Sequence, residues 1–136
     1  HGGSTYALFA SLQLAKQAVA DENMAAAEAH LRTALASAEP GSEWLQLIQV
    51  RLARVLAAKG DTEQALTLLA ASDGSMPAAV ATARGDIHLA AGREQEALDA
   101  YLEARAATLD MGNPPGLLDA KITSLQSRLD AAEQAS

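Results

Sequence analysis

The chain contains no cysteine, so it has no disulfide framework, no thiolate zinc site and no thiol nucleophile. Aromatic residues make up only 3 % of its 136 residues, and valine and isoleucine together number seven. A sheet-based core is therefore nearly excluded, because strands favour β-branched and aromatic side chains. No apolar run in the chain approaches the roughly 20 residues that a membrane-spanning helix needs.

Alanine and leucine dominate instead, with 33 and 20 residues. Both are strong helix formers, and a core of small side chains lets helices approach closely. The length fits one domain with a single continuous core. The formal net charge is −7, and the ten Lys and Arg residues are scattered along the chain. This composition predicts one all-α domain, and the acidic balance argues against a nucleic-acid partner.

Short segments of turn-forming residues divide the sequence into about seven stretches of helix length. Within the stretches, apolar residues recur every three or four positions, which is the pattern of a helix with one buried face. Ser42 is expected to cap the helix that follows it, while Gly60 and Gly92 are expected to end helices in the left-handed conformation. The dividing segments lie at 21–23, 39–42, 60–61, 72–77, 92 and 112–116.

The stretches repeat. A segment starting near Leu52 aligns with a second one 32 residues later, and a weaker copy precedes the first by 38 residues, with Glu22 where the others have glycine. The alignment pairs small residues with small ones, and one large residue with another, near the same turn. The matched positions are Ala53 with Gly85, Gly60 with Gly92, Ala65 with Ala97, and Leu69 with Tyr101, and Ala15 takes the first of these positions in the weaker copy.

This period, with its small residues and its turn glycine, resembles that of tetratricopeptide repeats. The resemblance implies an all-α, right-handed superhelix of about three helix pairs over residues 6–109, in which small residues let the two helices of a pair meet. Residues 110–136 are expected to form a loop and a C-terminal capping helix, with an apolar face that covers the end of the array. Residues 1–5 are expected to be a tag remnant, with native residues removed upstream. The alternative is an ordinary alanine-rich helical bundle.

No motif for covalent chemistry is present. The nine glycines form none of the phosphate-binding or nucleophile-elbow patterns. His30 and His88 are 58 residues apart and have no second ligand at metal-binding spacing. His88 is expected to be a partly buried structural residue, at a position where these repeats often have an aromatic ring. We therefore expect no enzyme activity, no cofactor, no metal and no small-molecule substrate.

The first helices of the pairs are expected to line a concave face that binds polypeptide. Most residues at these positions are apolar, which favours a hydrophobic or weakly specific peptide over an acidic tail. The alternative is that the capping helix or a second copy of the chain buries several of them. The predicted protein-binding residues are Phe9, Leu12, Lys16, Val19, Leu47, Val50, Arg54, Asp86 and Leu89.

A more specific likeness lies in the segments 14–19, 50–60, 64–66 and 83–92, above all in the Arg-Leu-Ala-Arg-Val-Leu run at 51–56 and the Arg-Gly-Asp-Ile run at 84–87. From about Tyr6 to Arg128 the chain resembles the periplasmic domain of the YfgM family, which are ancillary subunits of the bacterial SecYEG translocon. The resemblance implies a domain that faces the periplasm from an inner-membrane anchor missing here. It also implies three kinds of partner: SecYEG, the periplasmic chaperone PpiD, and unfolded exported polypeptides in transit to chaperones.

A second hypothesis is a soluble tetratricopeptide scaffold in another envelope or cytosolic assembly. An anchor segment upstream of Tyr6 in the native gene would favour the translocon subunit over this scaffold. A third hypothesis, a hydrolase or another enzyme, has no motif in its support, and turnover lost on mutation of His88 would revive it.

Overall fold

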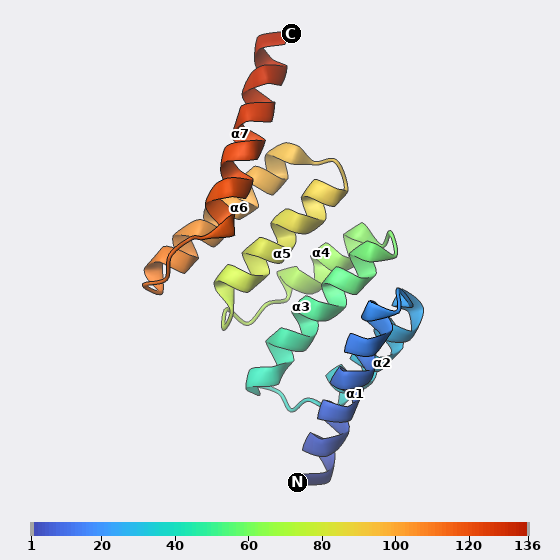
Figure 1. Ribbon diagram of the computed structural model, residues 1–136. Helices are drawn as coiled ribbons and strands as arrows, with labels where there is room; N and C mark the ends of the chain where they lie inside the picture. The colour runs from blue at the N-terminus through green and yellow to red at the C-terminus, as the bar shows by residue number, and fades with distance from the viewer. Residues whose placement is uncertain (1, 136) are drawn as a thin grey trace. The chain divides into compact units, whose positions relative to one another are not determined.

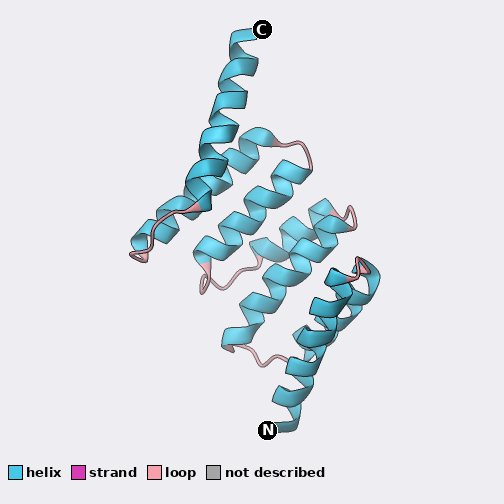
Figure 2. Ribbon diagram, viewed as in Figure 1, coloured by secondary structure: helices cyan, strands magenta, loops and turns pink. Residues whose placement is uncertain are grey.

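The computed structural model describes residues 2–135, with side chains from Thr5 onward. Over that range the chain forms seven α-helices and no strand, so the all-α prediction is confirmed (Figures 1 and 2). The helices pair in sequence order as α1 with α2, α3 with α4, and α5 with α6, and α7 follows them. Their bounds are α1 Gly2–Ala20, α2 Met24–Ser37, α3 Glu43–Ala58, α4 Thr62–Ala70, α5 Pro77–Ala90, α6 Glu94–Asp110 and α7 Leu117–Ala135.

The helices form two compact units. The first unit, His1–Ser75, contains α1 to α4, and the second unit, Met76–Ser136, contains α5 to α7. The composition alone had indicated one continuous core, whereas each unit has buried residues of its own. This division is physically reasonable for a repeat architecture, because each repeat packs mainly against its neighbours in sequence.

The turn inside each pair has the same backbone geometry. A residue in the left-handed conformation follows the first helix, and the amide of the next residue donates back to a carbonyl five residues earlier, as in a Schellman motif. Gly60 and Gly92 hold this position with φ of 92° and 79°, as predicted. Glu22 holds it in the first pair with φ of 60°, although it is not glycine. The amide donors are Asn23, Asp61 and Arg93, at 2.8, 2.9 and 2.9 Å from the carbonyl oxygens of Ala18, Leu56 and His88.

Small residues meet large ones where the two helices of a pair cross. Gly85 on α5 faces Tyr101 on α6, and a Cβ at Gly85 would lie 2.5 Å from two carbons of the Tyr101 ring. The matching positions 16 residues apart in the other pairs hold Ala53 with Leu69 and Ala15 with Leu31, all of them buried. The larger ring therefore stands opposite the smaller residue. Ala27, Ala65 and Ala97 on the second helices are also fully buried, as the repeat alignment predicts.

The last helix closes the second unit. Leu118, Ile122 and Leu125 of α7 are buried in one cluster with Tyr101 and Leu98 of α6, and Leu129 packs against its edge. This confirms the apolar face expected of a C-terminal helix. A polar contact adds to it, because Asp86 of α5 accepts hydrogen bonds from the Tyr101 hydroxyl and from Lys121 Nζ, the latter at 2.8 Å.

One capping prediction needs correction. Ser42 does stand at the N-cap of α3, but its hydroxyl donates to and accepts from no group in the described part of the chain. The cap is formed by the backbone instead, with the amide of Leu45 3.3 Å from the Ser42 carbonyl oxygen. Asn23, which sequence reasoning treated only as a helix breaker, is the residue whose side chain caps a helix, since its Oδ1 accepts from the amide of Ala26 at 3.1 Å.

Candidate functional site

The first unit contains an open groove of about 370 Å³, which is formed by α1, α2 and α3. Its volume lies at the lower end of the range usual for ligand pockets, roughly 300 to 1,000 Å³. The floor is made of buried apolar side chains from all three helices, among them Ala15, Leu31 and Val55. We call it the α1/α3 groove, and its lining residues are Ala15, Lys16, Val19, Met24, Leu31, Arg51, Arg54, Val55 and Ala58.

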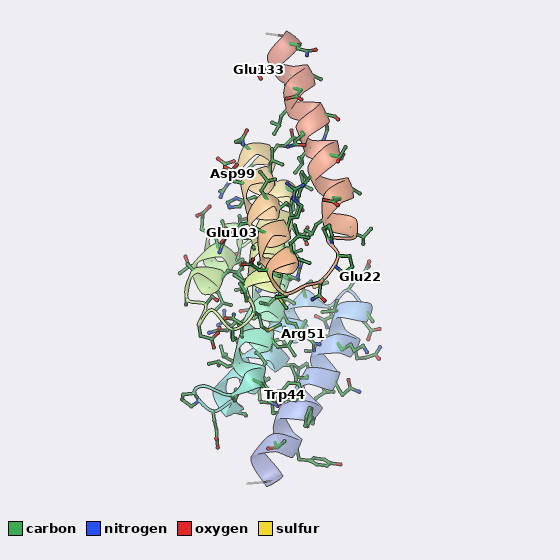
Figure 3. All side chains as sticks on the ribbon, turned by 90° about the vertical axis from the view of Figure 1, so that its left-hand side faces the viewer. Glu22, Trp44, Arg51, Asp99, Glu103 and Glu133 are labelled. Atoms are coloured by element: carbon green, nitrogen blue, oxygen red, sulfur yellow. The ribbon has the colours of Figure 1, made fainter. Side chains whose placement is uncertain are left out.

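The rim of this groove is basic. Lys16 comes from α1, whereas Arg51 and Arg54 come from α3, three residues apart and therefore on the same side of that helix. All three side chains are exposed, and Figure 3 labels Arg51 on the ribbon. The lining includes no Asp or Glu, although the chain has 17 carboxylates. An acidic protein therefore carries a local concentration of positive charge beside an apolar floor.

A neighbouring cation is already neutralised. Glu28 of α2 accepts a hydrogen bond from Lys59 Nζ at 2.6 Å and from Arg32 Nε at 2.7 Å. These two bonds, with that of Lys59 first, hold the pKa of the Glu28 carboxyl below its ordinary value, and the Glu28 bond raises the pKa of Lys59. Lys59 therefore ties the end of α3 to α2, and its charge is shared with Glu28.

The predicted binding residues of the first unit divide into two groups. Lys16, Val19 and Arg54 do line the α1/α3 groove. Leu12 and Val50 are buried, at 6 % and 7 % exposure, so they cannot present a surface as predicted. Each lies on the face that packs its helix onto the core. Successive helical residues are rotated by about 100°, so a predicted row that is shifted by one position falls on a different face. Leu47 is half-buried.

Sequence reasoning missed Arg51 and Met24 of the rim. The residues predicted on α3 are Leu47, Val50 and Arg54, whereas the row in the groove is Arg51, Arg54, Val55 and Ala58. Spacing by three and four alone could have found this second row, since residues 51, 54, 55 and 58 also share one helical face. What was lacking is the orientation of the helix, because large apolar residues lie on more than one face of α3.

The two predicted residues of the second unit are covered by its own last helix. Asp86 is held by Tyr101 and by Lys121 of α7, as described above. Leu89 packs against the apolar cluster that includes Ile122 and Leu125. Both residues are half-buried, and their contacts with α7 and its cluster favour the alternative in which the capping helix covers part of the predicted face. Whether any of the nine residues contacts a partner stays a prediction.

Phe9 lies outside the groove. Its ring meets that of Trp44 edge to face, with ring centroids 5.0 Å apart and an interplanar angle of 82°, and so joins α1 to α3. Together with Tyr6, Ala10 and Gln13 it lines a shallow depression on α1. Phe9 is 43 % exposed and Tyr6 80 % exposed, so this part of α1 presents aromatic side chains to solvent.

Groups for other chemistry are sparse. No cluster of three or more His, Asp and Glu side chains with metal-binding geometry occurs within residues 2–135. His88 is half-buried on α5, as predicted for a structural residue. Among the helices that the structure describes, none combines the length and apolarity that crossing a bilayer requires. The α1/α3 groove, apolar below and basic at its rim, has the chemistry to hold a ligand.

Antiparallel helix pairs of this length, joined by identical turns and packed through small residues, define a helical-repeat protein of the kind that binds other proteins through the faces of its helices. The chain belongs to the tetratricopeptide repeat-like domain family, whose model matches residues 1–127. The match covers all three helix pairs and most of α7. No curated protein and no solved structure matches the chain significantly. The family indicates a protein–protein interaction scaffold.

Proposed function

We propose that this chain is the protein-binding domain of an inner-membrane-anchored ancillary subunit of the bacterial SecYEG translocon. In this role the domain faces the periplasm, interacts with the chaperone PpiD and helps to hand over exported polypeptides. The support is the resemblance of segments 50–60 and 83–92 to the YfgM family, together with membership of the tetratricopeptide repeat-like family. The mechanism is reversible binding, with no covalent step.

The observation that carries a binding function is the α1/α3 groove, with exposed apolar and basic side chains at its rim and buried apolar ones below. A groove between adjacent helices suits a peptide segment. We place the contact with PpiD or with an exported chain in this groove.

The test is photocrosslinking in the full-length protein, expressed in its native bacterium and extracted from membranes. A photoreactive residue replaces Val19, an exposed side chain on the groove rim, and the matched control replaces Gln126, an exposed side chain on α7. We expect adducts with PpiD or SecY from position 19, identified by mass spectrometry, and few from position 126. Recovery of soluble cytosolic or other envelope proteins in place of the translocon would instead support the scaffold of another assembly.

A further inference from the structure

Most Lys and Arg side chains in the described part of this chain form ion pairs within their own unit, whereas two that line the α1/α3 groove do not. At least six of the ten Lys and Arg side chains form ion pairs with carboxylates of their own unit, and Arg54 and Arg93 have interaction partners as well. Lys16 and Arg51 form no ion pair or hydrogen bond with any group in the part of the chain that the structure describes, and both line the α1/α3 groove. In a chain with 17 carboxylates, two cations that pair with none of them are available to a ligand.

The two cations stand on different helices beside one apolar floor. Lys16 is on α1 and Arg51 on α3, and Leu31 of α2 and Val55 of α3 lie in the floor of the same groove. A ligand that fills the floor with apolar groups therefore brings its flanking polar groups to the basic rim on either side. Carboxylates are the groups that Arg and Lys bind by charge-assisted hydrogen bonds.

We infer that the α1/α3 groove binds a segment of a partner protein in which large aliphatic side chains are flanked by two or more carboxylates of Asp or Glu. The aliphatic side chains lie on the floor, one carboxylate pairs with Lys16 and another with Arg51. This inference deepens the proposed function and rests on the protein-binding role within it. It also revises the expectation of a purely hydrophobic or weakly specific peptide, because a basic rim selects for acidic segments.

The inference is tested with the purified chain and a synthetic peptide, blocked at both ends, in which two leucines lie between glutamates. One control peptide has glutamine in place of every glutamate, and a second has serine in place of both leucines. Fluorescence anisotropy of the labelled peptide gives Kd at low and at physiological salt. We expect the acidic apolar peptide to bind at least about tenfold more tightly than either control, and its binding to weaken with salt.

The variant Lys16→Gln/Arg51→Gln is expected to weaken binding of the acidic peptide by about tenfold or more, since charge-assisted hydrogen bonds contribute on this scale. The matched control, Arg105→Gln/Arg128→Gln, removes the same net charge from exposed ion pairs of the second unit. It is expected to leave Kd nearly unchanged. Val19→Asp adds a negative charge to an exposed rim position and is expected to abolish binding while circular dichroism retains the helical signal.

Three results would overturn the inference: equal affinity for the glutamate and glutamine peptides, equal losses in the two double variants, or binding to vesicles of anionic lipid with none to the peptides. The first result would mean that the groove is apolar but does not select for charge. The second would mean that the loss of binding is a long-range effect of net charge. The third would mean that the groove binds lipid. None of these assays contains SecYEG or PpiD. Failure here with translocon adducts from position 19 would therefore refute the acidic ligand alone, whereas peptide binding without those adducts would refute the translocon assignment alone.

Discussion

The two units treat the surfaces of their helices differently. In the first unit, the α1/α3 groove leaves Lys16 and Arg51 without a carboxylate and exposes Val19. In the second unit, α7 covers the apolar cluster, and its Lys121 pairs with Asp86 of α5. The same kind of helix pair thus has its surface covered by α7 in the second unit and exposed as a groove in the first. The difference indicates that end-capping uses the surface of the third pair, whereas the first unit keeps an open groove.

The largest effect is expected when the packing of α7, which closes the second unit, is weakened. Leu125→Ala removes a side chain that is 1 % exposed in the α7 cluster and is expected to destabilise the second unit by about 2 to 5 kcal/mol. Trp44 is the only tryptophan and lies in the first unit, so its fluorescence follows that unit, while circular dichroism follows all helices. In urea we expect the dichroism transition to move to lower concentration and the fluorescence transition to move much less.

The matched control is Gln126→Ala, an exposed position one residue further along α7, which should change neither transition. If Leu125→Ala moves the two transitions together by the same amount, the units do not have separate stabilities and the comparison fails.

A second prediction concerns the contact inside the third pair. Gly85→Leu places a side chain where even a Cβ would lie 2.5 Å from the Tyr101 ring, and overpacking of this kind costs about 1 to 3 kcal/mol. Gly85→Ala is expected to cost less. The measurement is the midpoint of urea unfolding by circular dichroism. An unchanged midpoint in Gly85→Leu would contradict the repeat register.

The second pair suggests a second substitution that should rescue Gly85→Ala. There Ala53 faces Leu69, so Gly85→Ala combined with Tyr101→Leu recreates its combination of side chains. We expect the double variant to lose less stability than the sum of the two single losses, because the clash is absent. Additive losses would mean that positions 85 and 101 do not compete for the same space. Tyr101→Leu also removes the hydrogen bond from Tyr101 to Asp86, so the double variant still loses the stability that this bond contributes.

The pairing, the turns and the capping helix could be predicted because each follows from local chemistry at a fixed spacing. Gly60, Gly92 and the small residues at 53 and 85 are required by backbone conformation or close approach, and a repeat shows such requirements more than once. The orientation of α3 was not fixed by its sequence, because its large apolar residues lie on more than one face, and the predicted row was therefore displaced from the groove.

Buried polar contacts between distant segments were also beyond sequence reasoning. Gln46 is completely buried on α3, and its Oε1 accepts hydrogen bonds from Ser72 Oγ at 2.8 Å and from the amide of Asp73 at 3.0 Å. Nothing near Gln46 in the sequence indicates these partners, which follow α4. Asp86 has a partner at an even greater separation, Lys121, 35 residues along the chain. Asp86 was therefore interpreted as a surface residue when it secures the capping helix.

A smaller change in stability is expected in the first unit. Its α1–α2 turn places Glu22 at φ of 60°, where the other two pairs have glycine. Left-handed backbone costs most residues about 1 to 2 kcal/mol, and the greater chain entropy lost by glycine offsets part of that. Glu22→Gly is therefore expected to stabilise the first unit by about 0.5 to 1 kcal/mol, seen as a later Trp44 fluorescence transition in urea. Glu22→Ala keeps the strain while it removes the charge, so it should give no such gain.

The smallest expected effect comes from the Glu28 ion pairs beside the groove. Because Lys59 and Arg32 lower the pKa of Glu28, its contribution to stability is present above the ordinary carboxyl pKa and is lost as pH falls through the lowered value. The stability difference between wild type and Glu28→Gln, followed by Trp44 fluorescence in urea, should therefore be small at pH 7 and vanish in acid. Glu103→Gln breaks a more exposed pair with Arg84 in the second unit, and its effect, followed by circular dichroism in urea, should be smaller. A Glu28 difference that grows in acid would have the wrong sign and would show that this carboxylate does not hold α2 to the end of α3.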